Sequence, residues 1–213
     1  ADTHKEMSQE SAPILTQEEK PVALISSFDL ITPNSQDVCA TDTPWRAGSR
    51  RLNSREHLFT GGCLAVEMRL SSPAYIFLVG QDPTGDLTRM FPSGCPDFQT
   101  IDAFIEPGKR FQFPPLFDSR ARVLELEGTP GMERVYAIAI TAPDLATRFG
   151  YQLDGLQGLC QSGKSFPEML SAGGGWQSHE RINRWQRYLK RLATQYPEKV
   201  QWKEFRFWHD RPL

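Results

Sequence analysis

Two groups of side chains in the sequence have types and spacings that can do chemistry. Cys160 and His179 are a thiol and an imidazole, the pair that thiol hydrolases use as nucleophile and base. Glu67, Asp82 and Asp86 are carboxylates close enough in sequence to form an acid–base pair at one end of a sheet. A simpler explanation is that Cys160 forms one half of a disulfide and that the three carboxylates lie in turns or on a solvent-exposed face. We therefore predict no catalytic residue.

A third candidate is a phosphate-loop pattern. Residues 158–165, GLCQSGKS, match GxxxxGK[ST] with Lys164 as the phosphate-binding lysine. Such a loop follows a buried parallel strand and opens a long helix, whereas residues 151–156 make a poor strand and the next helix contains Pro167. A nucleotide-binding protein using Lys164, or a thiol hydrolase using Cys160, is therefore our alternative hypothesis.

The four cysteines are Cys39, Cys63, Cys95 and Cys160. They form no C-x-x-C pair and no histidine lies at zinc-ligand spacing, so we expect no metal and no cofactor. In a meander of strands, Cys63 and Cys95 would lie at opposite ends, which favours Cys39–Cys63 with Cys95–Cys160. Cys39–Cys95 with Cys63–Cys160, or four reduced thiols, are the alternatives. Two disulfides would place the chain in the periplasm or outside the cell.

The composition is that of an ordinary globular chain and excludes some partners. The 213 residues have 23% charged residues and a net charge of −2, which gives no overall attraction to nucleic acid or to an anionic membrane. No stretch approaches the ~20 apolar residues of a transmembrane segment. The start at Ala1 fits the removal of a signal peptide and equally fits trimming of the chain.

The clearest strand pattern lies between the second and third cysteines. Residues 64–70 alternate between apolar and mainly polar positions, as a half-buried strand does, and residues 74–79 (AYIFLV) are apolar on both faces. Residues 82–85 (DPTG) have the composition of a tight turn, and residues 87–91 return as the next strand. We expect an antiparallel meander whose central strand is buried on both sides.

The second half of the chain changes from strand to helix. Residues 133–141 (ERVYAIAIT) alternate as a strand, and residues 144–149 predict a short helix that ends at Gly150. The longest helix is predicted over residues 179–195, where apolar residues recur three and four positions apart. Residues 200–208 (VQWKEFRFW) follow as an aromatic-rich last strand.

These patterns predict a mainly β fold. We expect an antiparallel, Ig-like β-sandwich over residues 22–142, built from short strands separated by Pro/Gly turns. A flexible N-terminal arm, residues 1–21, would precede it. A C-terminal α+β extension, residues 143–213, would contain two helices and a strand packed on the sandwich.

Four segments in order carry a family resemblance: LAVEMRLSSP (64–73), AYIFLVGQDPTGDLTRMFP (74–92), EPGKRFQFP (106–114) and PGMERVYAIAI (130–140). From about Trp45 to Pro143 the chain resembles the bacterial family called domain of unknown function 4384. Ser93 stands where that family usually has Asn. The resemblance implies an accessory β-sandwich module, of a kind appended to bacterial kinases or caspase-like proteases or carried on envelope proteins, with no recognised catalytic residues.

Aromatic and basic residues near the C-terminus are the candidates for partner binding. The predicted long helix carries five cations, which include Arg184 and Arg187. These would meet phosphates or acidic lipid head groups or, as we prefer, form a solvated face. Trp176, Trp202 and Trp208 would be interface residues or core. We predict a non-enzymatic accessory or adaptor protein that uses these five residues to bind another protein of the bacterial envelope or of a secretion system.

Overall fold

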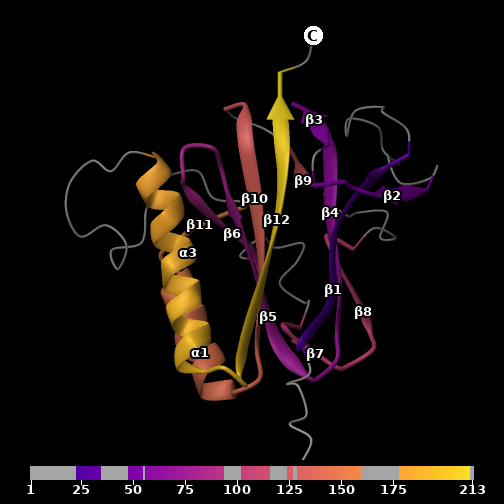
Figure 1. The fold of residues 1–213 in the computed structure, drawn as a ribbon. Coiled ribbons are helices and arrows are strands. Elements are labelled where there is room, and N and C mark those ends of the chain that lie inside the picture. Colours follow the sequence, from indigo (N-terminus) through magenta and orange to yellow (C-terminus); the bar gives the residue numbers. More distant parts are fainter. Residues whose placement is uncertain are drawn as a thin grey trace, which may run out of the picture.

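The fold is a β-sandwich with a layer of helices on one outer face (Figure 1). The computed structural model describes residues 23–34, 48–54, 56–93, 102–115, 124–126, 129–159 and 178–211. Within them, strands predominate and form two sheets, and the helical part is small. The predicted mainly β, sandwich-like architecture is confirmed.

The first sheet is the smaller of the two and lies within the first 125 residues of the chain. Its order is β2 (Ser49–Arg51), β1 (Ile25–Pro33), β4 (Cys63–Leu70) and β8 (Arg110–Phe113), and the short β9 (Leu124–Glu125) also pairs with β4. All of these pairings are antiparallel.

The second sheet is larger and mixed. Its order is β11 (Gln157–Gly158), β6 (Leu87–Phe91), β5 (Ala74–Gln81), β10 (Gly131–Ile140), β12 (Val200–Asp210) and β3 (His57–Phe59), and β7 (Phe104–Ile105) also pairs with β5. The pairings of β5, β6, β10 and β12 with one another are antiparallel. The two short outer strands, β11 and β3, pair in parallel with their neighbours.

The predicted three-strand meander is wrong at its first strand. Residues 71–73 do not form a hairpin within one sheet; they carry the chain from β4 in the first sheet to β5 in the second. The two strands face each other across the sandwich, where alternate side chains of both lie in the same core: Leu64, Val66, Met68 and Leu70 of β4, and Ile76 and Leu78 of β5. The second step of the meander, β5 to β6, is confirmed.

Strands β5 and β10 are buried on both faces, as the sequence predicted for residues 74–79. Ile76 and Leu78 face the core between the sheets, whereas Phe77 and Val79 face a second core beneath the helices. The same alternation on β10 places its alanines between the sheets and its larger side chains under the helices. Small residues on one side bring the sheets together, and large residues on the other fill the space beneath the helices.

Two described helices cover the outer face of the second sheet, on the side away from the first sheet (Figure 1). They are α1 (Pro143–Leu153) and α3 (Ser178–Gln195). The apolar stripe predicted on α3 is present, and its Trp185 and Leu189 are buried in the second core. The prediction that α1 ends at Gly150 is wrong, because Phe149 and Leu153 continue its buried stripe, and their burial outweighs the low helix propensity of glycine.

The last strand is an inner strand of the second sheet. β12 pairs with β10 over ten residues, from Gly131–His209 to Ile140–Val200, and Phe207 lies in the core between the sheets. The division into an arm, a sandwich and an extension stays a prediction. The C-terminal segment nevertheless contributes a strand to the sandwich as well as helix to its outer layer.

Candidate functional site

The three carboxylates that the sequence marked for acid–base chemistry each have a structural partner. Glu67 forms an ion pair with Arg110 across β4 and β8. Oδ1 of Asp82 accepts hydrogen bonds from the backbone N–H of Thr84 and of Asp86, which stabilises the turn between β5 and β6. Asp86 pairs with Arg181 of α3, with 2.7 Å between Nη1 and Oδ1. The turn and the helix are therefore joined.

Several sequence-predicted residues lie outside the described part of the chain. They are Trp176, three of the predicted disulfide cysteines (Cys39, Cys95 and Cys160) and, from the alternative hypothesis, Lys164. Cys63, the cysteine that the structure does describe, is buried and disulfide-bonded. Its partner is not among the described residues, so the predicted pairing stays a prediction.

The predicted binding residues that the structure describes differ in how far they are exposed. Trp202 is partly buried in the core beneath the helices, 6.1 Å from Tyr136 between ring centroids. Arg184 is also only partly exposed, whereas Arg187 is exposed on α3. Trp208 is 41% exposed near the end of β12, where its ring stacks on His57 of β3 at an interplanar angle of 11°. Of the predicted residues, Arg187 and Trp208 are thus the most accessible.

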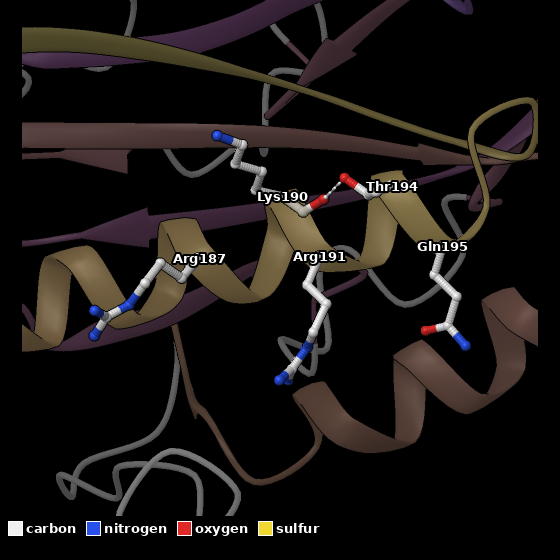
Figure 2. A pocket seen from close by; sticks show the side chains of 5 residues that line it. All are labelled: Arg187, Lys190, Arg191, Thr194 and Gln195. Atoms are coloured by element: carbon white, nitrogen blue, oxygen red, sulfur yellow. Dashed lines mark hydrogen bonds between the residues drawn. The ribbon is translucent and has the colours of Figure 1, made fainter.

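The accessible cations of α3 form a stripe along its C-terminal half. We call Arg187, Lys190 and Arg191 the basic stripe; all three are exposed, and Lys190 and Arg191 stand three and four residues after Arg187. They border an open depression of about 510 Å³ together with Thr194 and Gln195. Figure 2 shows Arg187 and Arg191 extending from one side of α3 and Lys190 from the other, while the Thr194 hydroxyl bonds to the Lys190 carbonyl.

The stripe is unneutralised within the described structure. Arg181, nearer the start of α3, has Asp86 as its partner, but the described residues contain no ion pair for Arg187, Lys190 or Arg191. Like charges three or four residues apart on a helix repel one another by a few tenths of a kcal/mol, roughly, for each pair. A bound anionic group would remove this repulsion. The stripe is therefore better suited to an acidic partner than to stabilising the fold.

Sequence reasoning missed one cation beside the stripe. Arg148 of α1 is exposed, and together with Arg191 it lines a cleft between the two helices. The available signal was the spacing of Arg148 and Gln152, four residues apart, which places both on one face of a helix. This spacing was not recognised, because the helix was predicted to end at Gly150 and residue 152 lies beyond that end.

A hydroxyl–imidazole–carboxylate series was also invisible in the sequence. Thr60 Oγ1 lies 2.9 Å from Nε2 of His209, and Nδ1 of His209 lies 3.2 Å from Oε1 of Glu133. The residues are 149 and 76 positions apart in sequence. The order of groups resembles that of a nucleophile, a general base and an orienting acid.

The protonation of this series favours a structural role. Burial and the negative charge of Asp82 raise the pKa of Glu133 to about 8, and burial lowers the pKa of His209. We therefore assign the proton to Glu133, which donates to Nδ1; Nε2–H then donates to Thr60, whose hydroxyl donates to the Asp210 carbonyl, 3.3 Å away. In this arrangement Nε2 has no lone pair with which to accept the Thr60 proton.

A second polar network joins α3 to the sheet. The buried Tyr136 hydroxyl donates to Oε1 of Gln81 at 2.9 Å. Nε2 of Gln186 bonds both to the Tyr136 hydroxyl at 3.3 Å and to Oε2 of Glu204 at 2.9 Å. Glu204 also pairs with Arg206. These hydrogen bonds hold α3 in one rotation about its axis. In that rotation the face with the basic stripe is turned toward solvent.

The comparison with known families gives one match. Residues 57–143 match the family described as Domain of unknown function (DUF4384). The resemblance predicted from the sequence is confirmed. The match runs from β3 to the first residue of α1, so the basic stripe and β12 lie outside it. No curated protein and no solved structure matches the chain.

Two absences hold for the residues that the structure describes. Among them, neither helix has the length and apolar character needed to cross a membrane. Within the same residues, histidine, cysteine, aspartate and glutamate do not gather in groups of three or more that could hold a metal ion.

Proposed function

We propose that the protein is a non-enzymatic adaptor, in the periplasm or secreted, that binds an acidic segment of another protein of the bacterial envelope or of a secretion system. The binding surface is the basic stripe of α3, with Trp208 as a second contact at the far end of β12. The observation that carries the proposal is the exposure of Arg187, Lys190 and Arg191 without a described ion pair.

Electrostatics supports a specific acidic partner over general adhesion to anions. The whole chain has a net charge of −2, so it does not attract anionic surfaces at long range. The stripe is a local concentration of positive charge on this slightly acidic molecule. Complementary charge at such a patch raises the rate of encounter and selects the partner's orientation.

A defined acidic probe tests the proposal. A fluorescein-labelled peptide of eight glutamates and four leucines is titrated with the protein, and its anisotropy is measured at 50 and 150 mM salt. In a second peptide, glutamines replace the glutamates. The glutamate peptide should bind more tightly than the glutamine peptide. The difference in affinity should be smaller at 150 mM salt, because salt screens the exposed charges of the stripe.

A matched pair of variants separates the stripe from the net charge. Arg187→Glu/Lys190→Glu reverses two charges on the stripe, and Arg69→Glu/Lys109→Glu reverses two exposed charges on or beside the first sheet. The first variant should lose at least tenfold in affinity and the second less than threefold. Equal loss in both variants, or no loss in the first, would contradict the proposed function.

A further inference from the structure

We propose that the cleft between α1 and α3 is a carboxylate-binding site that holds one acidic side chain of the bound partner. This inference rests on the proposed function, because the cleft lies beside the basic stripe and would secure the acidic segment that the stripe attracts. Among the residues that the structure describes, none of those predicted to bind a partner lines this cleft or lies on α1.

The cleft has the size of a single side chain and a mixed lining. Its volume is about 210 Å³, and it lies between the C-terminal half of α3 and the middle of α1. Arg148, Gln152, Arg191 and Gln195 contribute polar groups, while Phe149 and Leu192 contribute apolar surface. A glutamate side chain has a carboxylate for the polar groups and methylenes for the apolar surface. A phosphate ion would leave the apolar surface unused.

Two arginines reach this cleft from different helices. Arg148 comes from α1 and Arg191 from α3, and among the described residues neither forms an ion pair. Tyr188 and Arg191 both line the cleft; burial raises the pKa of Tyr188 to about 12, and the positive charge of Arg191 opposes that rise. Guanidinium groups offer paired N–H donors that match the two oxygens of a carboxylate.

An amide donor is oriented beside them. The Tyr188 hydroxyl donates to Oε1 of Gln152, so the amide nitrogen is the part of Gln152 left to donate. Nε2 of Gln195 bonds to the Tyr196 hydroxyl at 3.3 Å and keeps a second hydrogen. The cleft therefore combines two cations with two amide donors, and the described structure shows no acidic side chain lining it.

The walls of the cleft are held in place before any ligand arrives. Tyr188 stacks on Trp185 at a centroid distance of 5.5 Å and on Phe149 at 6.4 Å. Both partners are buried in the core beneath the helices. Because this packing orders Tyr188, the hydrogen-bond partner of Gln152, that part of the lining loses less conformational entropy on binding.

The cleft is also continuous with the basic stripe. Arg191 and Gln195 line both the cleft and the open depression along α3. In Figure 2, both side chains extend to the side of α3 on which α1 lies. A peptide along the stripe can therefore place one acidic side chain in the cleft without a change in the helices.

A small probe tests the cleft separately from the stripe. The probe is glutamate with both backbone ends blocked, so that its only charge is the side-chain carboxylate; blocked glutamine and inorganic phosphate are the comparisons. Binding is followed by NMR through the side-chain amide signals of Gln152 and Gln195. Blocked glutamate should shift both signals, and blocked glutamine should not. A stronger shift with phosphate than with blocked glutamate would identify a general anion site and overturn the inference.

Two variants give the matched contrast. Arg148→Gln removes a cleft cation outside the stripe and should weaken binding of blocked glutamate at least fivefold. Arg187→Gln removes a stripe cation outside the cleft and should change it less than twofold. Circular dichroism checks that both variants keep the fold. Equal effects of the two changes would overturn the inference.

The same variants distinguish the two proposals. If the acidic peptide binds in a stripe-dependent manner but Arg148→Gln has no effect on it, the cleft inference fails and the proposed function stands. If blocked glutamate occupies the cleft but the acidic peptide does not depend on the stripe, the proposed function fails and the site itself remains.

Discussion

Nδ1 of His209 lies 3.2 Å from a carboxylate oxygen of Glu133, and the histidine is completely buried. The pair joins neighbouring strands, β10 and β12, near the end of the sandwich where β3 also pairs. Two titratable groups at a buried position make the stability of this end of the molecule depend on pH.

The first prediction concerns that dependence. Glu133 has its pKa raised from 4.5 to about 8 by burial and by Asp82, so the folded state holds a proton that the unfolded chain releases. This contribution to stability is complete below pH 4.5 and is lost as the pH rises through 8. His209 has a lowered pKa, so its contribution to stability has the opposite pH dependence: it is complete above pH 6.5 and is lost as the pH falls below that value. Between pH 6.5 and 8, Glu133 should therefore dominate.

In that window the free energy of unfolding should fall by about 2 kcal/mol, at about 1.4 kcal/mol per pH unit. Glu133→Gln keeps a donor for His209 and cannot ionise, so it should remove most of this fall. Urea unfolding at pH 6.5, 7.25 and 8 measures it, with the exposed Glu198→Gln as the control. An unchanged slope in Glu133→Gln would assign the titration to another group.

The second prediction concerns the polar network under α3. Tyr136→Phe removes the hydroxyl that donates to Gln81, and it leaves the oxygen of this buried glutamine without that donor. We expect a loss of about 1–3 kcal/mol in the free energy of unfolding. Tyr151→Phe is the matched control, because Tyr151 is 73% exposed and should change stability by less than about 0.5 kcal/mol. Similar losses of stability in both variants would show that the network does not help to hold α3 on the sheet.

The third prediction separates two tryptophans. Trp185→Ala empties a fully packed position between α3 and the sheet and should cost about 3–5 kcal/mol. Trp208→Ala loses a partly exposed stacking contact with His57 and should cost about 1 kcal/mol. Thermal unfolding ranks the variants. Trp208→Ala should also weaken partner binding while the fold remains; full affinity in this variant would remove Trp208 from the proposed surface.

The fourth prediction concerns the disulfides. Peptide mapping of the unreduced protein should recover Cys63 linked to Cys39, with Cys95 linked to Cys160, and a thiol count on the denatured protein should find no free thiol. Cys63 is disulfide-bonded in the structure, as both the predicted and the alternative pairing require. Recovery of Cys63 with Cys160 would establish the alternative pairing. Free thiols at all four positions would remove the argument for an oxidising compartment and would reopen Cys160 as a nucleophile.

Local patterns in the sequence were enough to identify the longer strands β4, β5, β10 and β12 and the long helix, but not the short strands β2, β3, β7 and β11. The alternating apolar residues of β4 are those that face the core between the sheets, and the apolar residues at three- and four-residue spacing in α3 are those that pack on the second sheet. The exposed cations of α3 also followed from the sequence, because residues opposite an apolar stripe face solvent. These features depend on residues that are close together in sequence, so the sequence alone is enough to predict them.

The tertiary structure decided which elements meet. The sequence does not encode locally that residues 71–73 cross between sheets, that β12 pairs with β10, or that α1 continues past Gly150. For the same reason it did not reveal the contact of His209 with Glu133 or the shared cleft of Arg148 and Arg191. Each of these depends on burial of apolar surface between segments far apart in sequence, and that energy is defined only when the whole chain has packed.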